Sequence, residues 1–128
     1  MVTAVTNYGR SGLHDWVMQR ITAVILLAYT VFIFAVVFLC DLDYSGWKSL
    51  FDQTWVKVFS LGAILSIALH AWIGLWSVST DYFIPRVLTL KVGAAVGAQA
   101  NLLRWLFQAA SAIVLFTYVV WGIQILWG

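Results

Sequence analysis

Three long uncharged stretches dominate the pattern of apolar and polar positions along the chain. They are residues 21–40, 58–80 and 105–127. At about 1.5 Å per residue, each is long enough to cross a hydrocarbon layer of roughly 30 Å. A backbone in lipid must satisfy its own hydrogen bonds, and these runs are about twice as long as barrel strands. The sequence therefore predicts an all-α integral membrane protein with three transmembrane helices, in which residues 1–128 form a single membrane domain.

The composition excludes several other classes of protein. Of 128 residues, 63% are hydrophobic and only 9% are charged, compared with about a quarter in ordinary soluble domains. A chain this small has a high ratio of surface to volume and would need more polar residues to cover a water-exposed surface. A net charge of +2 without a basic cluster is also too little for a nucleic-acid binder. The solvent of this chain must be a lipid bilayer.

The chemistry-bearing residues limit what the chain can hold alone. It has a single cysteine, Cys40, which excludes an internal disulfide and an iron–sulfur cluster bound by this chain alone. It also lacks a glycine-rich phosphate loop and an HExxH motif. The first uncharged stretch is too long for the apolar core of a cleavable signal peptide, so we expect it to be retained. Any redox cofactor must be shared with a partner.

Positive charges near the ends of the spans predict the orientation. The side shared by the N-terminus and the second loop carries Arg10, Arg20, Arg86, Lys91 and Arg104, and the other side carries Lys48 and Lys57. Five basic residues against two favour a cytoplasmic N-terminus and a periplasmic C-terminus. We therefore expect a multi-pass protein of the bacterial cytoplasmic (inner) membrane.

The flanking segments carry signals for the ends of the helices. Ser11 is a candidate cap ahead of Asp15, so the first helix is predicted to begin before the membrane. Pro85 disfavours helical geometry at the residue before it, which predicts that the second helix stops just past Tyr82. Residues 91–101 are rich in small side chains and predict a surface loop or a loosely held short helix.

The most informative residue is His70, which lies near the middle of the second span. An ionisable side chain at that depth is costly and usually functional, and neutral imidazole is the commonest metal ligand. At about 100° per residue, the other residues on the same narrow face of the helix as His70 all have small or acidic side chains. The face consists of Ala63, Ser66, His70, Gly74, Ser77 and Asp81. Bulky apolar residues cover the opposite half, so the His70 face is predicted to contact something other than lipid.

Two interpretations of this face remain open. In the first, small residues let helices approach closely and His70 only forms a hydrogen bond to a neighbouring helix. In the second, His70 binds a flat cofactor, with Gly74 leaving room for a porphyrin. A low-spin haem takes two axial ligands, and His14, the other histidine, belongs at the membrane boundary. The second ligand would therefore come from a partner subunit.

Two motifs add a resemblance to a known family. HAWIGLWSVSTDY (residues 70–82) and GRSGLHDWVMQR (residues 9–20), followed by a third uncharged helix, resemble the hydrophobic membrane anchor of bacterial succinate dehydrogenase. This is the smaller of the two anchor chains of succinate:quinone oxidoreductase, or respiratory complex II. The resemblance covers most of the chain in order, but residues 91–101 depart from it because the second loop of the family is usually shorter.

The resemblance implies roles for five residues. His70 matches an axial ligand of haem b, which is shared with the larger, cytochrome b-type anchor chain. Tyr82 matches a tyrosine that donates to a ubiquinone carbonyl, and Asp81 matches the acid beside it. Arg20 and His14 match basic residues near the haem propionates. The resemblance also implies an iron–sulfur subunit and a flavoprotein subunit, which would hold the iron–sulfur clusters and FAD.

Elementary chemistry is compatible with these roles but leaves alternatives. Quinone reduction needs proton donors at the carbonyls, and a neutral phenol and a carboxylate near water can supply them. Tyr82 could equally be an interfacial tyrosine, Asp81 a helix-end charge, and Arg20 a residue that sets topology.

The expected function is that of a subunit, not catalytic alone, which passes electrons from succinate oxidation to ubiquinone in the respiratory chain and the tricarboxylic acid cycle. Three alternatives remain open. They are a fumarate reductase anchor using menaquinone, a proton or solute translocator with His70 and Asp81 as relay groups, and a purely structural scaffold.

Overall fold

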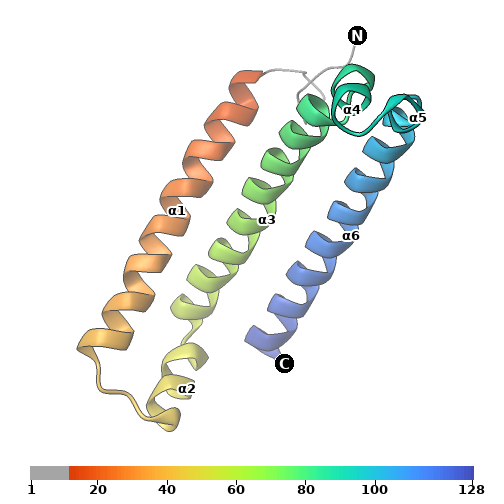
Figure 1. Ribbon diagram of the computed structural model, residues 1–128. Coiled ribbons are helices and arrows are strands. Elements are labelled where there is room, and N and C mark those ends of the chain that lie inside the picture. Colours follow the sequence, from red (N-terminus) through yellow and green to blue (C-terminus); the bar gives the residue numbers. More distant parts are fainter. Residues whose placement is uncertain (1–11) are drawn as a thin grey trace.

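The computed structural model describes residues 12–128, and all of its regular elements there are helices (Figure 1). They are α1 (Gly12–Leu39), α2 (Tyr44–Asp52), α3 (Thr54–Tyr82), α4 (Pro85–Lys91), α5 (Ala94–Gly97) and α6 (Ala100–Trp127). The three longest, α1, α3 and α6, are long and apolar enough to cross a membrane. The predictions of an all-α fold and of three candidate spans are therefore confirmed.

The long helices begin before the uncharged stretches. Helix α1 begins at Gly12, nine residues before the start of the predicted span, so the helix indeed starts early. The proposed cap, Ser11, lies outside the described residues. Helix α3 begins at Thr54 and includes Lys57, and α6 begins at Ala100 and includes Arg104. A charged side chain near a span end does not interrupt the helix, since it can extend toward the membrane surface.

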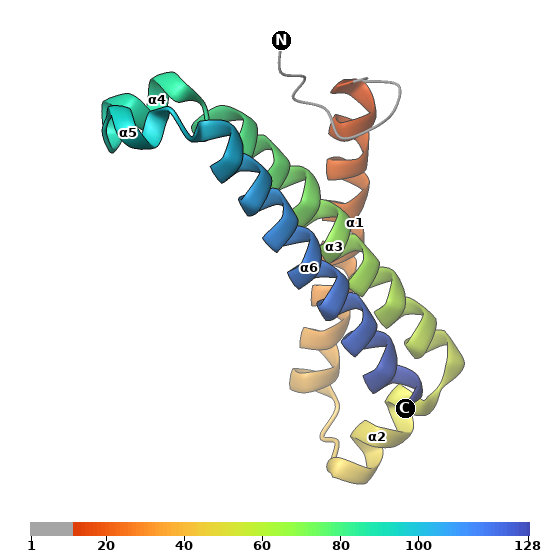
Figure 2. The same ribbon diagram turned by 90° about the vertical axis from the view of Figure 1, so that its right-hand side faces the viewer.

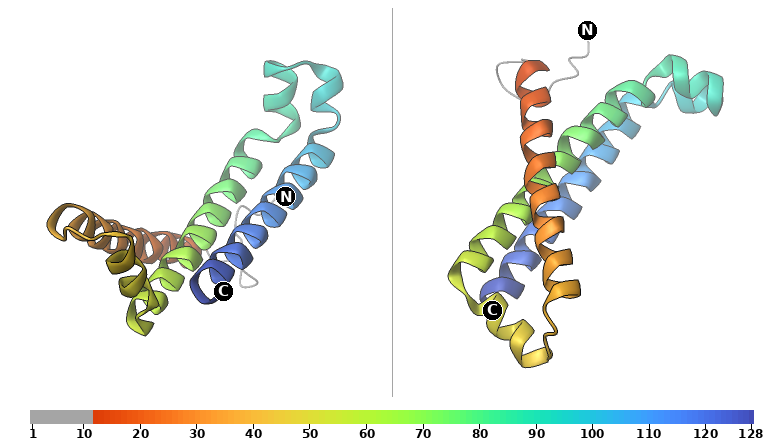
Figure 3. Two further views of the ribbon diagram at one scale, coloured as in Figure 1. Left: turned by 90° about the horizontal axis from the view of Figure 1, so that it is seen from below. Right: turned by 90° about the vertical axis from the view of Figure 1, so that its left-hand side faces the viewer.

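Helix α3 lies at the centre of the bundle, and the two other long helices pack against it (Figure 1). Helices α3 and α6 run side by side, whereas α1 crosses them at a clear angle (Figures 2 and 3). Helix α1 begins at the end of the bundle where α3 ends, which we call the Tyr82 end, and α6 finishes at the opposite, Trp127 end. The chain therefore crosses the bundle three times.

Aromatic rings fill the contact between α1 and α3 toward the Trp127 end. The Phe59 ring lies 5.1 Å from Tyr29 and 5.4 Å from Phe32, and the Trp55 ring lies 5.6 Å from Phe32. Tilted and edge-to-face rings at these separations attract one another beyond their apolar contact. The Tyr29 hydroxyl also forms a 2.9 Å hydrogen bond with the buried Ser60. These contacts fix the position of α1 along α3.

Contacts between α3 and α6 combine close packing with one polar bridge. The Nε2 group of Gln108 donates a 2.8 Å hydrogen bond to Oγ of the fully buried Ser79. Nearer the Trp127 end, Gly122 lies against the side chain of Ile64, which leaves little room for a larger residue. Small residues and polar bridges of this kind replace the hydrophobic driving force that is absent between helices in lipid.

Helix α2 is a short amphipathic element that the apolar pattern alone did not predict. Asp43 caps it, because its carboxylate accepts hydrogen bonds from the backbone N–H of Gly46 at 2.8 Å and from the Ser45 hydroxyl at 3.1 Å. The Trp47 and Phe51 rings lie 5.0 Å apart, one turn from each other. This arrangement is typical of a helix lying along a membrane surface.

The cap of α2 should make this helix sensitive to acid. The hydrogen bonds from Gly46 and Ser45 lower the pKa of Asp43 from its ordinary value of 3.8. A lowered pKa in the folded state means that the cap stabilises α2 above pH 3.8 and is lost as the pH falls through the folded value. We expect the Gly46 amide to exchange hydrogen faster at low pH, after correction for intrinsic rates. Asp43→Asn, which keeps an acceptor but does not titrate, should remove this dependence, and an unchanged acid response in that variant would contradict the assignment.

Between α3 and α6 the chain forms a helical hairpin rather than an irregular loop. Helix α3 ends at Tyr82 as predicted, Ile84 is extended, and Pro85 opens α4. Gly93, with φ of 127°, turns the chain into α5. Helix α6 then starts at Ala100. Residues 91–101 therefore contain the last residue of α4, the whole of α5 and the first residues of α6.

Gly97 allows α4 and α5 to pack closely, and its replacement should open the hairpin. A Cβ atom at this position would collide with Oγ1 of Thr89 and lie 3.0 Å from the Pro85 carbonyl oxygen. We expect Gly97→Ala to destabilise the hairpin by about 1–3 kcal/mol, as overpacking does. Faster hydrogen exchange over residues 85–99 would measure this loss. Gly62→Ala is the matched control, since a Cβ there meets nothing within 4 Å, and equal effects of both changes would contradict the close-packing argument.

Candidate cofactor site around His70

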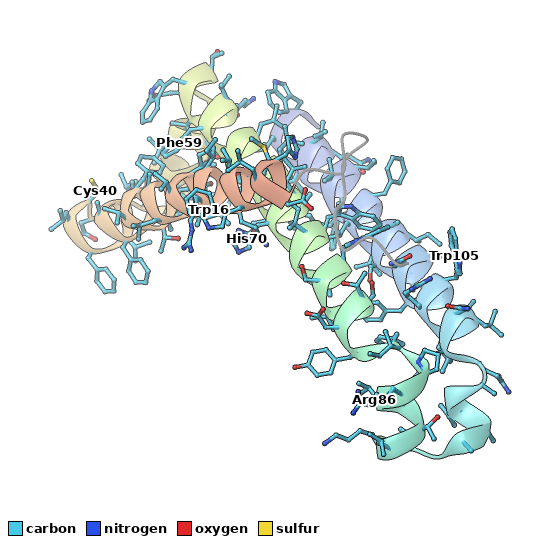
Figure 4. All side chains as sticks on the ribbon, turned by 90° about the horizontal axis from the view of Figure 1, so that it is seen from above. Trp16, Cys40, Phe59, His70, Arg86 and Trp105 are labelled. Carbon is cyan, nitrogen blue, oxygen red and sulfur yellow. The ribbon has the colours of Figure 1, made fainter. Side chains whose placement is uncertain are left out.

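His70 lies near the middle of α3 and is attached to α1 at two points. Its ring atom Nδ1 lies 3.0 Å from Oγ1 of Thr22, and its backbone carbonyl accepts a 3.3 Å hydrogen bond from Nε2 of Gln19. Seen from above in Figure 4, the residue lies in the angle between α1 and α3. The contact therefore fixes both the ring and the backbone of His70 relative to the first helix.

The second ring nitrogen of His70 has no such contact. Within residues 12–128 no hydrogen bond joins Nε2, and the residue is only partly buried by this chain. A histidine ligand to iron has this arrangement, with one nitrogen hydrogen-bonded to the protein and the other free for the metal. The donor set therefore fits one axial position of a haem.

Helix packing accounts for three other residues of the predicted face. Ala63 and Ser66 are buried, and Ala63 lines a cavity of about 260 Å³ with Tyr29 and Ser60. At Gly74, an added Cβ would lie 3.8 Å from Nε2 of Gln19, which is an ordinary contact. Close helix approach therefore explains this part of the stripe, and the space at Gly74 borders α1.

Asp81 and Tyr82 lie at the end of α3, away from His70. Twelve residues of helix separate His70 from Tyr82, which corresponds to about 18 Å along the axis. Both residues are exposed, and the Tyr82 side chain is 62% accessible. Neither has a hydrogen bond of its side chain to another described residue. The structure thus separates a midmembrane imidazole from a phenol and a carboxylate at the Tyr82 end.

The two basic residues of α1 also lie toward the Tyr82 end. Nδ1 of His14 lies 3.5 Å from the carboxylate of Asp15, which is itself buried. The guanidinium of Arg20 lies 5.4 Å from the centre of the exposed Trp16 ring, a cation–π contact. Arg20 is about 160° round α1 from Thr22, so it does not share the face that contacts His70.

The bulky tryptophans of α3 have packing roles. The Trp72 and Trp76 rings lie 5.8 Å apart, and Trp72 lines an apolar groove of about 460 Å³ between α3 and α6. Trp72 therefore faces α6, in agreement with the prediction that bulky apolar residues lie opposite the His70 face. Among the described residues, no group of three or more His, Cys, Asp or Glu side chains could hold a metal ion without help.

Sequence reasoning missed the two residues that attach His70 to α1. Gln19 and Thr22 are spaced three apart, which places them on one side of the helix. Thr22 is 3% exposed, and Oε1 of Gln19 is buried without a hydrogen-bond partner among the described residues. The signal available in the sequence was this pair of polar side chains, three residues apart at the start of an apolar span.

The fold defines a multi-pass membrane protein with a single imidazole near the middle of its central helix. Residues 1–100 match the family described as the succinate dehydrogenase/fumarate reductase transmembrane subunit. A succinate dehydrogenase hydrophobic membrane anchor subunit from Coxiella burnetii (strain RSA 493 / Nine Mile phase I) is 35% identical over 126 residues, covering 96% of this chain and 95% of the relative. The chain belongs to the family of succinate dehydrogenase membrane anchor subunits.

Proposed function

We propose that this anchor subunit supplies one axial ligand, Nε2 of His70, to a haem b that it shares with a second anchor chain. The observation that supports this role is the hydrogen-bonding of the ring, in which Nδ1 contacts Thr22 while Nε2 is free in the described part of the chain. His14, the other imidazole, is at the start of α1 and cannot reach the same depth. The second ligand therefore comes from the partner anchor chain.

The surrounding residues have defined tasks toward this group. When bound, the haem supplies a one-electron carrier within the membrane. Thr22 and Gln19 hold the His70 ring and backbone in place. Arg20 and His14 are the basic side chains of α1 on the side of the Tyr82 end, and we assign them to the propionates.

A quinone site is proposed at the Tyr82 end of α3. Reducing ubiquinone takes two electrons and two protons, so the site needs a donor at a carbonyl and a path to water. The Tyr82 hydroxyl donates to one quinone carbonyl, and Asp81 passes protons from solvent. Both side chains are exposed in this chain, so partner subunits must complete the pocket.

The proposed assembly rests on the family to which the chain belongs. A flavoprotein subunit with FAD would oxidise succinate, and an iron–sulfur subunit would pass the electrons on. The single cysteine of this chain is too few to hold a cluster itself. With the N-terminus in the cytoplasm, both subunits sit on the Tyr82 end, and the complex belongs to the bacterial cytoplasmic membrane. The proposed spans within residues 1–128 remain 21–40, 58–80 and 105–127.

One purification tests this function. The chain, extracted in detergent with its partners, should show the reduced-minus-oxidised spectrum of haem b, and mass spectrometry should find a second anchor, an iron–sulfur subunit and a flavoprotein. Extracted ubiquinone would support succinate oxidation, whereas menaquinone and a lower haem potential would indicate a fumarate reductase. A colourless complex that transports protons or solutes would refute the haem proposal.

A further inference from the structure

We propose that Thr22 is a positioning residue that holds His70 in the one neutral tautomer able to bind iron. This inference rests on the proposed function of His70 and adds a residue of α1 to it. The Thr22 side chain is buried, at 3% exposure, and its Oγ1 lies 3.0 Å from Nδ1 of His70. The same oxygen lies 2.7 Å from the carbonyl oxygen of Met18.

The direction of these hydrogen bonds follows from counting hydrogens. A threonine hydroxyl has one hydrogen to donate, and a carbonyl oxygen can only accept. The distance to Met18 O is the shortest that Oγ1 makes, compared with 3.2 Å to Gln19 O, so the hydroxyl hydrogen lies on the Met18 bond. Oγ1 can therefore only accept from His70. The imidazole hydrogen must then be on Nδ1.

This tautomer leaves the lone pair of Nε2 free. In the other neutral tautomer Nε2 would carry the hydrogen and could not bind iron. The bonds form a chain from Nδ1–H through the Thr22 hydroxyl to the Met18 carbonyl, and in a medium of low dielectric constant each bond strengthens the next. Gln19 holds the His70 carbonyl, so this part of α3 cannot shift away from α1 without breaking a second contact.

The same hydrogen bond should change the midpoint potential of the haem. A donor bond from Nδ1–H makes the ligating nitrogen more basic, which stabilises ferric iron and lowers the midpoint potential. Removing the acceptor should therefore raise the midpoint potential of the haem and weaken its binding. Loss of an outer hydrogen-bond partner typically lowers metal affinity by about 10- to 100-fold.

Thr22→Val tests this in the assembled complex, because valine has nearly the same shape but no hydroxyl. We expect lower haem content, a higher midpoint potential in a redox titration and an altered low-spin ferric spectrum. Thr22→Ser keeps the hydroxyl and should restore the wild-type potential. Thr30→Val is the matched control, since the exposed Thr30 makes the same type of bond to Leu26 O at 2.8 Å but forms no hydrogen bond with another helix within residues 12–128. If Thr22→Val does not assemble, Thr22→Ala takes its place in the same comparison.

Two results separate this inference from the function on which it rests. If His70→Ala loses the haem while Thr22→Val matches the wild type in content, spectrum and potential, the positioning role is overturned and the ligand assignment stands. If His70→Ala keeps an unchanged haem, the ligand assignment fails and the role of Thr22 fails with it. A change in Thr22→Val that Thr22→Ser reverses and Thr30→Val does not share supports the inference.

Discussion

Complexes carrying His70→Ala are expected to lose most of their haem b, and any haem that remains should have an altered spectrum and potential. The change removes one of two axial nitrogens, which should weaken haem binding by more than the roughly 100-fold upper range for outer-shell changes. It also removes the Nδ1 group that lies 3.0 Å from Oγ1 of Thr22. The haem content per complex and the reduced-minus-oxidised spectrum measure the effect.

The control for this change is Ser77→Ala, on the same face of α3. Within residues 12–128, the Ser77 hydroxyl bonds only to the Ile73 carbonyl of its own helix, at 3.0 Å, so its loss should leave the haem intact. A water molecule or a neighbouring side chain that replaced the missing ligand would still change the spectrum. Wild-type content and an unshifted spectrum in His70→Ala would rule out His70 as a ligand.

Tyr82→Phe is expected to slow quinone reduction by about 10-fold. The change removes one hydroxyl, and losing a hydrogen bond worth about 1.4 kcal/mol to the transition state costs a factor of ten. Succinate oxidation with a soluble artificial acceptor should continue at the wild-type rate, because that reaction bypasses the membrane site. The ratio of the two activities is therefore the measurement.

Tyr44→Phe provides a matched control for the loss of a phenol. Tyr44 begins α2 at the Trp127 end and is 82% exposed, so removing its hydroxyl should change neither activity. Equal losses of both activities in Tyr82→Phe would indicate a defect in assembly instead of in quinone binding. An unchanged ratio in Tyr82→Phe would argue against Tyr82 as the donor.

The large features of the fold could be predicted from the sequence because they depend on length and charge alone. Uncharged runs of membrane length must be helical in lipid, and Pro85 ends the helix before it for steric reasons. Helix α2 could not be predicted in this way. It depends on a local cap at Asp43 and on one amphipathic turn, which a search for long apolar stretches does not detect.

The sequence predicted His70 on α3 but not the residues of α1 that contact it. His70 stands out because an ionisable group in an apolar span is rare. The partners Thr22 and Gln19 are ordinary polar residues until the rotation of α1 against α3 is known, and that rotation is set by the ring contacts of Tyr29, Phe32 and Phe59. Periodicity describes one helix at a time and contains no information on how two helices face each other.

The central position of α3 bears on the order of events during synthesis. Within residues 12–128, the hydrogen bonds of His70 to other helices go to α1, while Trp72 lines the groove between α3 and α6. Once the ribosome has released residue 82 into the membrane, the nascent hairpin already contains both described residues that form hydrogen bonds with His70, Gln19 and Thr22. If His70 binds haem as proposed, haem binding and pairing with the partner chain therefore need not wait for the last helix to be translated.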